Sequence, residues 1–249
     1  MAIIIKTPQE IALMREAGKI VAGALQMLAD KIRPGLVTSE LEKYTTRFLT
    51  ERHAIPSFKG YRGFPASLCV SVNEQVVHGI PGPVVLKEGD IVSLDVGAIY
   101  KGYQGDAAIT VPVGEINEQA RALIQVTEGS LYAGIAAAKE GAHVGDISWA
   151  VQFYVESRGF AVVREYVGHG IGRQMHEDLQ IPNFGQPGTG PALRKGMTLA
   201  LEPMVNAGDW RTRVLPDRWT VVTADGSLSA HFEHTIAIAG DEAEILTAL

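Results

Sequence analysis

The sequence predicts a mixed α/β protein in which two similar halves contribute to one sheet, with helices on its outside. Segments with helical spacing of apolar residues come in pairs, and each pair precedes segments rich in Val and Ile between Gly and Pro. A weak internal repeat, offset by 106 residues, aligns Gly35 and Leu41 with Gly141 and Ile147. The shared order of elements indicates two related halves with a cleft at their junction.

The first half begins with two predicted helices. Thr7 and Glu10 can form a capping box, and Pro8 suits the first helical position, so a helix is predicted over residues 8–32. Thr38 is the predicted cap of the second helix, whose apolar residues follow with helical spacing.

The second half repeats this pair, with a helix over residues 117–138 and another from a cap at Asp146 to residue 158. The remaining apolar segments have the composition and punctuation of strands. The predicted strands cover residues 66–72, 90–99, 103–113, 160–167, 197–206, 219–223 and 231–239.

Composition limits the classes of protein that the chain can belong to. With 46% hydrophobic and 20% charged residues, the 249 residues are expected to form a single catalytic domain over 1–249. The net charge of -6 argues against nucleic acid as a partner. Cys69 is the only cysteine, and the sequence has neither a secretory signal nor a run of about 18 apolar residues. A cytoplasmic location without membrane attachment is therefore predicted.

Two acidic residues stand in segments that read as neighbouring strands. Asp95 is the one acid in an apolar run, and a hairpin centred between residues 100 and 101 places Asp106 directly opposite it. Directly opposed side chains have Cβ atoms roughly 4.5–5.5 Å apart, where like charges repel. Taken singly, Asp95 is explained equally well as a hydrogen-bonded buried acid, and Asp106 as a solvated turn residue, as by a functional role. Together they favour a cation between them.

Three further candidates for the same site lie later in the chain. His169 stands between two glycines, Glu202 ends an apolar strand, and Glu233 is embedded in a β pattern. Four carboxylates and one imidazole suit divalent ions such as Mn²⁺, Fe²⁺ or Co²⁺, with Zn²⁺ as an alternative. Two ions about 3.5–4 Å apart would spread the acidic charge and supply a nucleophile.

His78 and His176 are the remaining candidates for proton transfer, because each lies near glycines or loops. A structural role is the simpler explanation for either one alone. His231 and His234 have no comparable setting, although His234 adjoins Glu233.

Seven short motifs, in this order and spacing, resemble those of the type I methionine aminopeptidases, in metallopeptidase family M24. The motifs are Gly60-Tyr61-Arg62-Gly63-Phe64-Pro65-Ala66-Ser67, Ser71-Val72-Asn73-Glu74, His78-Gly79-Ile80-Pro81, Gly105-Asp106, Gly168-His169-Gly170-Ile171-Gly172, Leu201-Glu202-Pro203-Met204 and Glu233-His234-Thr235. The resemblance spans almost the whole chain. It implies the pita-bread fold, in which two α/β halves related by a pseudo-twofold form a curved antiparallel sheet with helices on its outer face.

The resemblance also implies an activity. Members of the family remove the initiator methionine from nascent proteins whose second residue is small. They use two divalent ions (Co, Mn, Fe, Zn or Ni) and act as cytoplasmic monomers, and the substrate suggests transient association with the ribosome.

Residue roles follow from the same resemblance. The five family ligands match Asp95, Asp106, His169, Glu202 and Glu233. Asp106 and Glu233 resemble the bridging carboxylates, and Glu202 is also the general base. His176 would stabilise the oxyanion, and His78 would contact the scissile amide nitrogen.

By the same resemblance, the family's methionine pocket maps to Tyr61, Phe64, Cys69, His78 and Trp219. Phe58 and Met175 are expected nearby, and His176 is also expected to contact the substrate. The main-chain oxygens of Asn73, Gln75 and Ser229 match a monovalent cation site for Na⁺ or K⁺. Taken alone, the aromatic residues read as ordinary core.

Three departures from the family pattern leave every ligand in place. Gly97 replaces a threonine near the metals, Val77 replaces a frequent cysteine, and Leu179 replaces a frequent proline. The loss of the threonine can alter metal preference.

Three other functions compete with this assignment: a proline-directed peptidase of the same fold, a non-catalytic binding module, and a hydrolase with another substrate and one or two metals. The first would carry a further domain, and the second would be expected to lack metal ligands.

Overall fold

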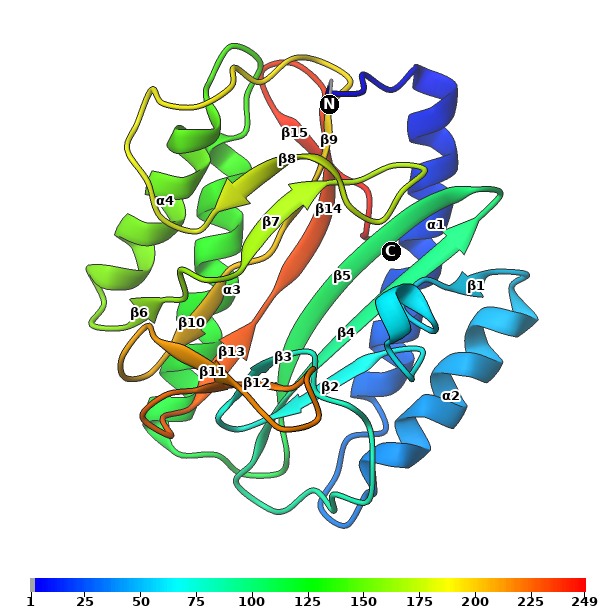
Figure 1. Cartoon of the computed structure of the whole chain (residues 1–249), viewed down its shortest axis with the longest axis vertical. Helices are drawn as coiled ribbons and strands as arrows, with labels where there is room; N and C mark the ends of the chain where they lie inside the picture. The colour runs from blue at the N-terminus through cyan, green and yellow to red at the C-terminus, as the bar shows by residue number, and fades with distance from the viewer. Residues whose placement is uncertain (1–2) are drawn as a thin grey trace.

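A computed structural model describes residues 3–249 of the chain. Figure 1 shows helices at both flanks of the molecule, with the strands between them. The helices in this part of the chain are α1 (Pro8–Ala29), α2 (Thr38–Glu51), α3 (Glu118–Ala137) and α4 (Val144–Glu156), with a short 3₁₀ helix η1 (Tyr61–Gly63). In the described residues, no helix is both long enough and apolar enough to span a membrane.

The main sheet has nine strands, and all of its pairings are antiparallel. Its main path is β1 (Ile55–Pro56), β4 (Ile91–Tyr100), β5 (Tyr103–Pro112), β14 (Glu233–Ile238), β9 (Thr198–Leu201), β7 (Val167–Gly170) and β8 (Glu177–Pro182), while β2 (Cys69–Val72) pairs with β4 and β15 (Ala243–Ile245) pairs with β14. The β5–β14 pairing joins the two halves of the chain. The predicted α/β class, with two halves closing one sheet, is confirmed.

Two small sheets lie beside the main one. The first contains β13 (Ser229–His231), β10 (Met204–Asn206) and β6 (Ala161–Val162), and the second contains β11 (Thr212–Val214), β12 (Val221–Thr223) and β3 (Gln75–Val77). Because β3 and β12 come from different halves, their pairing ties the halves together a second time.

The predicted helices exist, with corrections at their ends. Helix α1 begins with the predicted Thr7–Glu10 capping box but ends at Ala29, three residues before the predicted end. The prediction for Thr38 is wrong: Val37 is the N-cap, and the Thr38 hydroxyl donates 3.0 Å to the Gly82 carbonyl. Asp146 lies inside the first turn of α4 and accepts a hydrogen bond of 2.7 Å from the N–H of the N-cap residue, His143.

Three predicted strands are interrupted. The segment 197–206 splits into β9 and β10 at Glu202 and Pro203, and 231–239 splits at Phe232. Proline has no N–H for a strand ladder, which explains the first break. The segment 160–167 contains only β6 and the first residue of β7. The short strands β1, β3, β8, β11 and β15 were not predicted, because two to six residues give little periodicity.

Helix α1 supports the strands that carry the predicted acids. Its buried face, including Val21 and Leu28, packs with Leu94 and Val96 of β4. A side chain at Gly105 in β5 would lie 2.8 Å from the backbone nitrogen of Gly18, so only glycine permits this close approach. The backbone next to Asp106 is therefore held directly against the helix.

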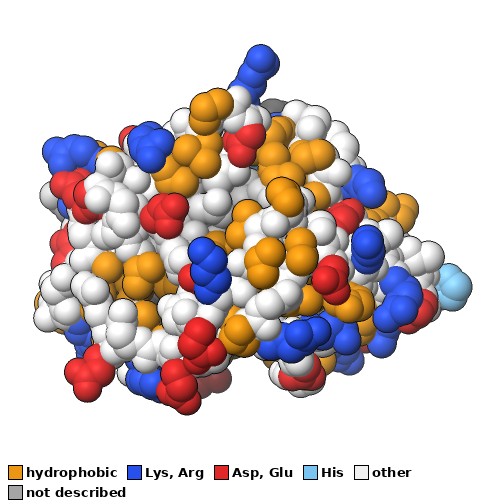
Figure 2. Space-filling view, turned by 90° about the horizontal axis from the view of Figure 1, so that it is seen from below, with side chains coloured by type: hydrophobic (Ala, Val, Ile, Leu, Met, Phe, Trp, Pro, Cys, Tyr) orange, Lys and Arg blue, Asp and Glu red, His pale blue; other side chains and the backbone are white. Residues whose placement is uncertain are grey.

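The surface in Figure 2 carries acidic and basic side chains interspersed, without an extended basic stripe on that face.

Candidate metal centre and substrate pocket

Five adjacent strands each bring one predicted ligand to the centre of the sheet. In the order β4, β5, β14, β9 and β7, they present Asp95, Asp106, Glu233, Glu202 directly after β9, and His169. One donor atom from each of Asp106, His169 and Glu233 lies within 4.8 Å of the others. Residues spread over the chain thus converge through strand order.

The hairpin register differs from the prediction. Asp95 lies opposite Ala108, and Asp106 lies opposite Gly97, so the two acids are diagonal neighbours on one face. The cause is the turn at Lys101 and Gly102, which have φ angles of 48° and 81°. A two-residue turn with both φ values positive centres the hairpin between these residues, one position later than predicted.

Small residues surround the acids. Ala108 lies opposite Asp95 on one side and opposite Glu233 on the other, and Gly97 lies opposite Asp106. The row formed by Asp95, Ala108 and Glu233 therefore has an open middle, where a bound ion can approach both carboxylates.

Burial and mutual repulsion disfavour negative charge at these acids when no cation is present. Burial raises the pKa of Asp95 to about 7. Burial, followed by the neighbouring carboxylates, raises the pKa values of Asp106, Glu202 and Glu233 well above the usual range.

Several buried oxygens of this cluster lack a hydrogen-bond partner among residues 3–249. These are Asp95 Oδ1, Asp106 Oδ1 and Glu233 Oε1. Buried polar atoms normally have a hydrogen-bond partner, so three unpartnered carboxylate oxygens in one place indicate a binding site for a cation. The residues fit divalent metal, because oxygen and imidazole donors are the ligands such ions prefer.

His169 is prepared as a neutral ligand. Burial lowers its pKa to about 3. Its Nδ1 lies 3.0 Å from the Gly170 carbonyl, which can only accept, so the proton sits on Nδ1. The lone pair of Nε2 is then free on the side of the cluster, 3.7 Å from Glu202 Oε1.

The cluster forms one wall of a cavity of about 150 Å³. All the residues predicted for the methionine pocket line it together with the four acids and the His169 imidazole. They are Phe58, Tyr61, Phe64, Cys69, His78, Met175, His176 and Trp219. Phe64 and Trp219 meet edge to face at 5.1 Å between ring centres. Burial, followed by the adjacent Asp95, raises the pKa of the Cys69 thiol well above its usual value, which disfavours a thiolate nucleophile.

The two candidate histidines also lie in the pocket. Burial lowers the pKa of His78 to about 4 and lowers that of His176, so both are neutral. The Tyr61 hydroxyl lies 2.8 Å from His176 Nδ1, and the ring centres of His169 and His176 are 4.2 Å apart.

Sequence reasoning missed two residues of the site. Arg62 lines the cavity, although it stood inside a motif that the sequence singled out. His231 is buried, with Nε2 3.8 Å from Glu202 Oε2. Its spacing of two from Glu233 is the signal that could have found it, since alternate strand residues share a face. His234 bonds to Thr247 at 2.8 Å instead.

Gly97 is required by its neighbours. A Cβ atom there would lie 2.7 Å from the Phe58 ring and 2.8 Å from the Met175 methyl group. A threonine at position 97 would therefore require Phe58 and Met175 to move from their present positions in the pocket.

Of the residues predicted to bind a monovalent cation, Asn73 lies in the turn between β2 and β3, Gln75 lies in β3 and Ser229 lies in β13. Ser229 donates its N–H to the Asn73 carbonyl at 2.9 Å, and the Gln75 side chain accepts from Val72 at 2.9 Å. The cation itself stays a prediction.

The profile of metallopeptidase family M24 matches residues 12–239. The chain belongs to metallopeptidase family M24. Among M24 relatives, the chain is 56% identical to "Methionine aminopeptidase 1" of Bacillus subtilis, across 98% of this chain and 99% of the relative. A methionine aminopeptidase of Clostridium perfringens is also 56% identical, with 98% of each chain covered.

Solved structures agree with this membership. The crystal structure of a methionine aminopeptidase from Thermotoga maritima is 54% identical, covers both chains completely and superimposes with a TM-score of 0.98. A prolidase from Pyrococcus furiosus shares the fold of this chain, with 22% sequence identity and a TM-score of 0.81. The resemblance inferred from the motifs, and the pita-bread fold with it, is confirmed.

Proposed function

We propose that the chain is a metal-dependent aminopeptidase that removes the initiator methionine from nascent proteins and peptides with a small second residue. The observation that carries the proposal is the convergence of five metal-type ligands on one wall of a small apolar pocket. Three relatives named methionine aminopeptidase are 54–56% identical to the chain, and the similarity covers nearly their whole length.

Asp95, Asp106, His169, Glu202 and Glu233 are assigned to hold two divalent ions drawn from Co, Mn, Fe, Zn and Ni. Asp106 and Glu233 are suited to bridge the ions, because both are buried and each presents an unpartnered oxygen. When bound, the ions would offset the acidic charge, polarise the scissile carbonyl and lower the pKa of a water molecule.

The pocket recognises the methionine side chain. Phe64, Trp219 and Cys69 provide a contiguous buried surface of ring edges and sulfur. A flexible thioether gains favourable contacts with aromatic rings at such a surface. Phe58 and Met175, packed over Gly97, limit its depth.

Glu202 is placed to move protons. Burial and the adjacent Asp106 raise the pKa of its carboxyl, and the neutral rings of His169 and His231 lie 3.7 and 3.8 Å away. A carboxyl with a raised pKa in a pocket is suited to accept a proton and pass it to the leaving amine.

His176 is placed to donate a hydrogen bond to the developing oxyanion. When the Tyr61 hydroxyl donates to Nδ1, Nε2 of the neutral ring must carry the proton. Such a fixed donor strengthens as negative charge grows on the carbonyl oxygen. His78, on the Trp219 side, is assigned to the scissile amide nitrogen.

Other parts of the proposal concern the setting of the reaction. Residues 1–249 act as one catalytic unit and as a monomer, in the cytoplasm, where nascent chains leave the ribosome. Main-chain oxygens at Asn73, Gln75 and Ser229 hold Na⁺ or K⁺ near the pocket wall.

The test is hydrolysis of Met-Ala-Ser by metal-free protein titrated separately with Mn²⁺, Fe²⁺, Co²⁺ and Zn²⁺. We expect metal-dependent release of methionine and no cleavage of a peptide with proline in second place after a bulky residue. Cleavage of the proline peptide alone, or no cleavage with any ion, would contradict the proposal.

A further inference from the structure

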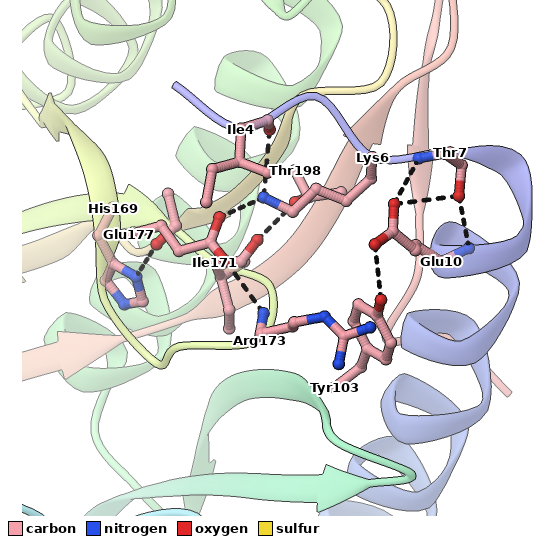
Figure 3. Close-up of polar contacts among 11 residues, drawn as sticks. Ile4, Lys6, Thr7, Glu10, Tyr103, His169, Ile171, Arg173, Glu177 and Thr198 are labelled. Atoms are coloured by element: carbon pink, nitrogen blue, oxygen red, sulfur yellow. Dashed lines mark hydrogen bonds and ion pairs between the residues drawn. The ribbon is translucent and has the colours of Figure 1, made fainter. Parts of the chain in front are cut away.

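A buried ion pair outside the pocket connects the N-terminal segment to the loop that carries His176. The Lys6 ammonium contacts the Glu177 carboxylate, and the two side chains are only 4% and 5% exposed. Figure 3 shows Lys6 reaching from the segment before α1 to the segment that contains Glu177. Surface ion pairs contribute little to stability, whereas removing one partner of a buried pair is strongly destabilising, because it leaves a buried charge without a partner.

Glu177 closes the loop between β7 and β8. One carboxylate oxygen, Oε1, accepts a 2.9 Å hydrogen bond from the backbone N–H of Arg173, and the other, Oε2, contacts Lys6. The closed segment, residues 173–177, includes Met175 of the pocket and His176. The carboxylate thus fixes both ends of the segment that presents these two side chains.

The N-terminal segment is itself anchored. The Lys6 N–H donates 2.8 Å to the Gly196 carbonyl, and Nζ donates 3.2 Å to the Ile4 carbonyl. A Cβ atom at Gly172 would lie 2.3 Å from Glu177 Oε1 and 2.5 Å from Lys6 Cε. Gly172 therefore provides the space that the pair occupies.

A second connection reaches the same loop from α1. Glu10 accepts a 2.6 Å hydrogen bond from the Tyr103 hydroxyl, and the Arg173 guanidinium lies 4.4 Å from the centre of the Tyr103 ring. Gln104, next along β5, donates its N–H to the Gly172 carbonyl at 2.8 Å. The loop is held on both sides by residues that do not touch the pocket.

We propose that Lys6 is a positioning residue for the reaction, which through Glu177 holds the His176 imidazole where the oxyanion forms. This inference rests on the proposed function, because it assigns Lys6 a part in that reaction. Without the ammonium, the Glu177 carboxylate turns toward water and releases the Arg173 N–H. A small displacement of a catalytic group can cost about 10²-fold in rate.

Lys6→Met keeps the length of the side chain and removes its charge. In Mn²⁺-loaded protein with Met-Ala-Ser, we expect kcat to fall about 10-fold and KM to rise by a smaller factor, because Met175 lies on the same loop as His176. Arg15→Met is the matched control, since it breaks the α1 ion pair with Glu244, whose side chains are 38% and 37% exposed. The control should retain full kcat, and thermal unfolding of each variant corrects for the folded fraction.

A double-mutant cycle separates positioning from general stability. If Lys6 acts through His176, Lys6→Met should cost less than 2-fold in a His176→Ala background. An equal loss in both backgrounds, or an unchanged kcat in the single variant, would overturn the inference.

The imidazole ¹⁵N signals of His176, assigned by their loss in His176→Ala, give a readout that needs no turnover. They should shift in Lys6→Met and stay in place in Arg15→Met; unshifted signals also overturn the inference. Failure of the proposed function looks different, because the wild-type chain would then not hydrolyse Met-Ala-Ser at all.

Discussion

Asp95 and Asp106 stand on a regular hairpin of two ten-residue strands, whereas His169, Glu202 and Glu233 stand at interruptions of much shorter strands. The register of β7 and β8 shifts at His169, β9 ends just before Glu202, and β14 begins at Glu233. The hairpin fixes its acids by an unbroken ladder. The other side turns its ligands into the pocket where the ladder breaks.

Glu202→Gln should give the largest effect. The amide keeps the size of the side chain but can neither accept a proton nor bind metal as a carboxylate, so we expect kcat/KM to fall about 10³-fold. The midpoint of thermal unfolding of the metal-free protein should stay the same or rise, because one of the repelling acids is removed. Loss of activity only in proportion to loss of folded protein would refute the assignment.

Gly97→Thr tests whether the β4–β5 hairpin tolerates extra side-chain volume beneath the pocket. The new Cβ would meet Phe58, Met175 and Ser57 at 2.7–2.9 Å, and overpacking typically costs about 1–3 kcal/mol. We expect KM for Met-Ala-Ser to rise about 10-fold as Phe58 and Met175 move, a change of about 1.4 kcal/mol. Ala98→Ser, which alters the next residue on the opposite face of β4, is a control for general strand damage. Equal KM values for Gly97→Thr and wild type would show that the pocket is independent of this glycine.

The stability of the metal-free protein should fall as pH rises from 6.5 to 8. The pKa of Asp95 is about 7 in the folded chain and near 4 in the unfolded chain, so the folded state holds more protons over this range. Raising the pH removes those protons, and the free energy of unfolding should drop by about 1 kcal/mol or more. The buried histidines oppose this fall near pH 6.5, because their pKa values are lowered in the folded chain and about half of each would be protonated in the unfolded chain. The difference in slope between wild type and Asp95→Asn therefore isolates the contribution of Asp95.

Denaturant unfolding of the metal-free protein at several pH values measures this slope. Asp95→Asn should make the slope less steep, although the raised pKa values of Asp106, Glu202 and Glu233 still contribute to it. Mn²⁺ should reverse the slope, because metal binding needs deprotonated carboxylates. A slope that is the same with and without Asp95 would contradict the assigned pKa.

The sequence predicted the regular parts of the molecule well. Capping at Thr7 depends on local hydrogen bonds, and α1 begins there in the structure. The helix predicted over residues 117–138 is α3, which is capped by Asn117. The ligands on the hairpin were found because an acid in an apolar run requires an explanation. Their register was missed by two residues, since the centre of the turn depends on backbone angles at Lys101 that composition does not reveal.

The irregular parts were less predictable. Nothing local to Lys6 announces a partner 171 positions away, and Glu177 reads as an ordinary charged residue beside a loop. His231 was missed because it has no glycine or loop beside it like those of His78 and His176, although its spacing of two from Glu233 was visible in the sequence. Contacts between distant segments decide these positions, and only the assembled sheet brings them together.

Anomalous diffraction from crystals of the Mn²⁺-loaded protein measures the central claim most directly. The account predicts two strong peaks, both enclosed by Asp95, Asp106, His169, Glu202 and Glu233, with Asp106 and Glu233 touching each. Peaks elsewhere on the molecule, with these side chains turned away from one another, would contradict it.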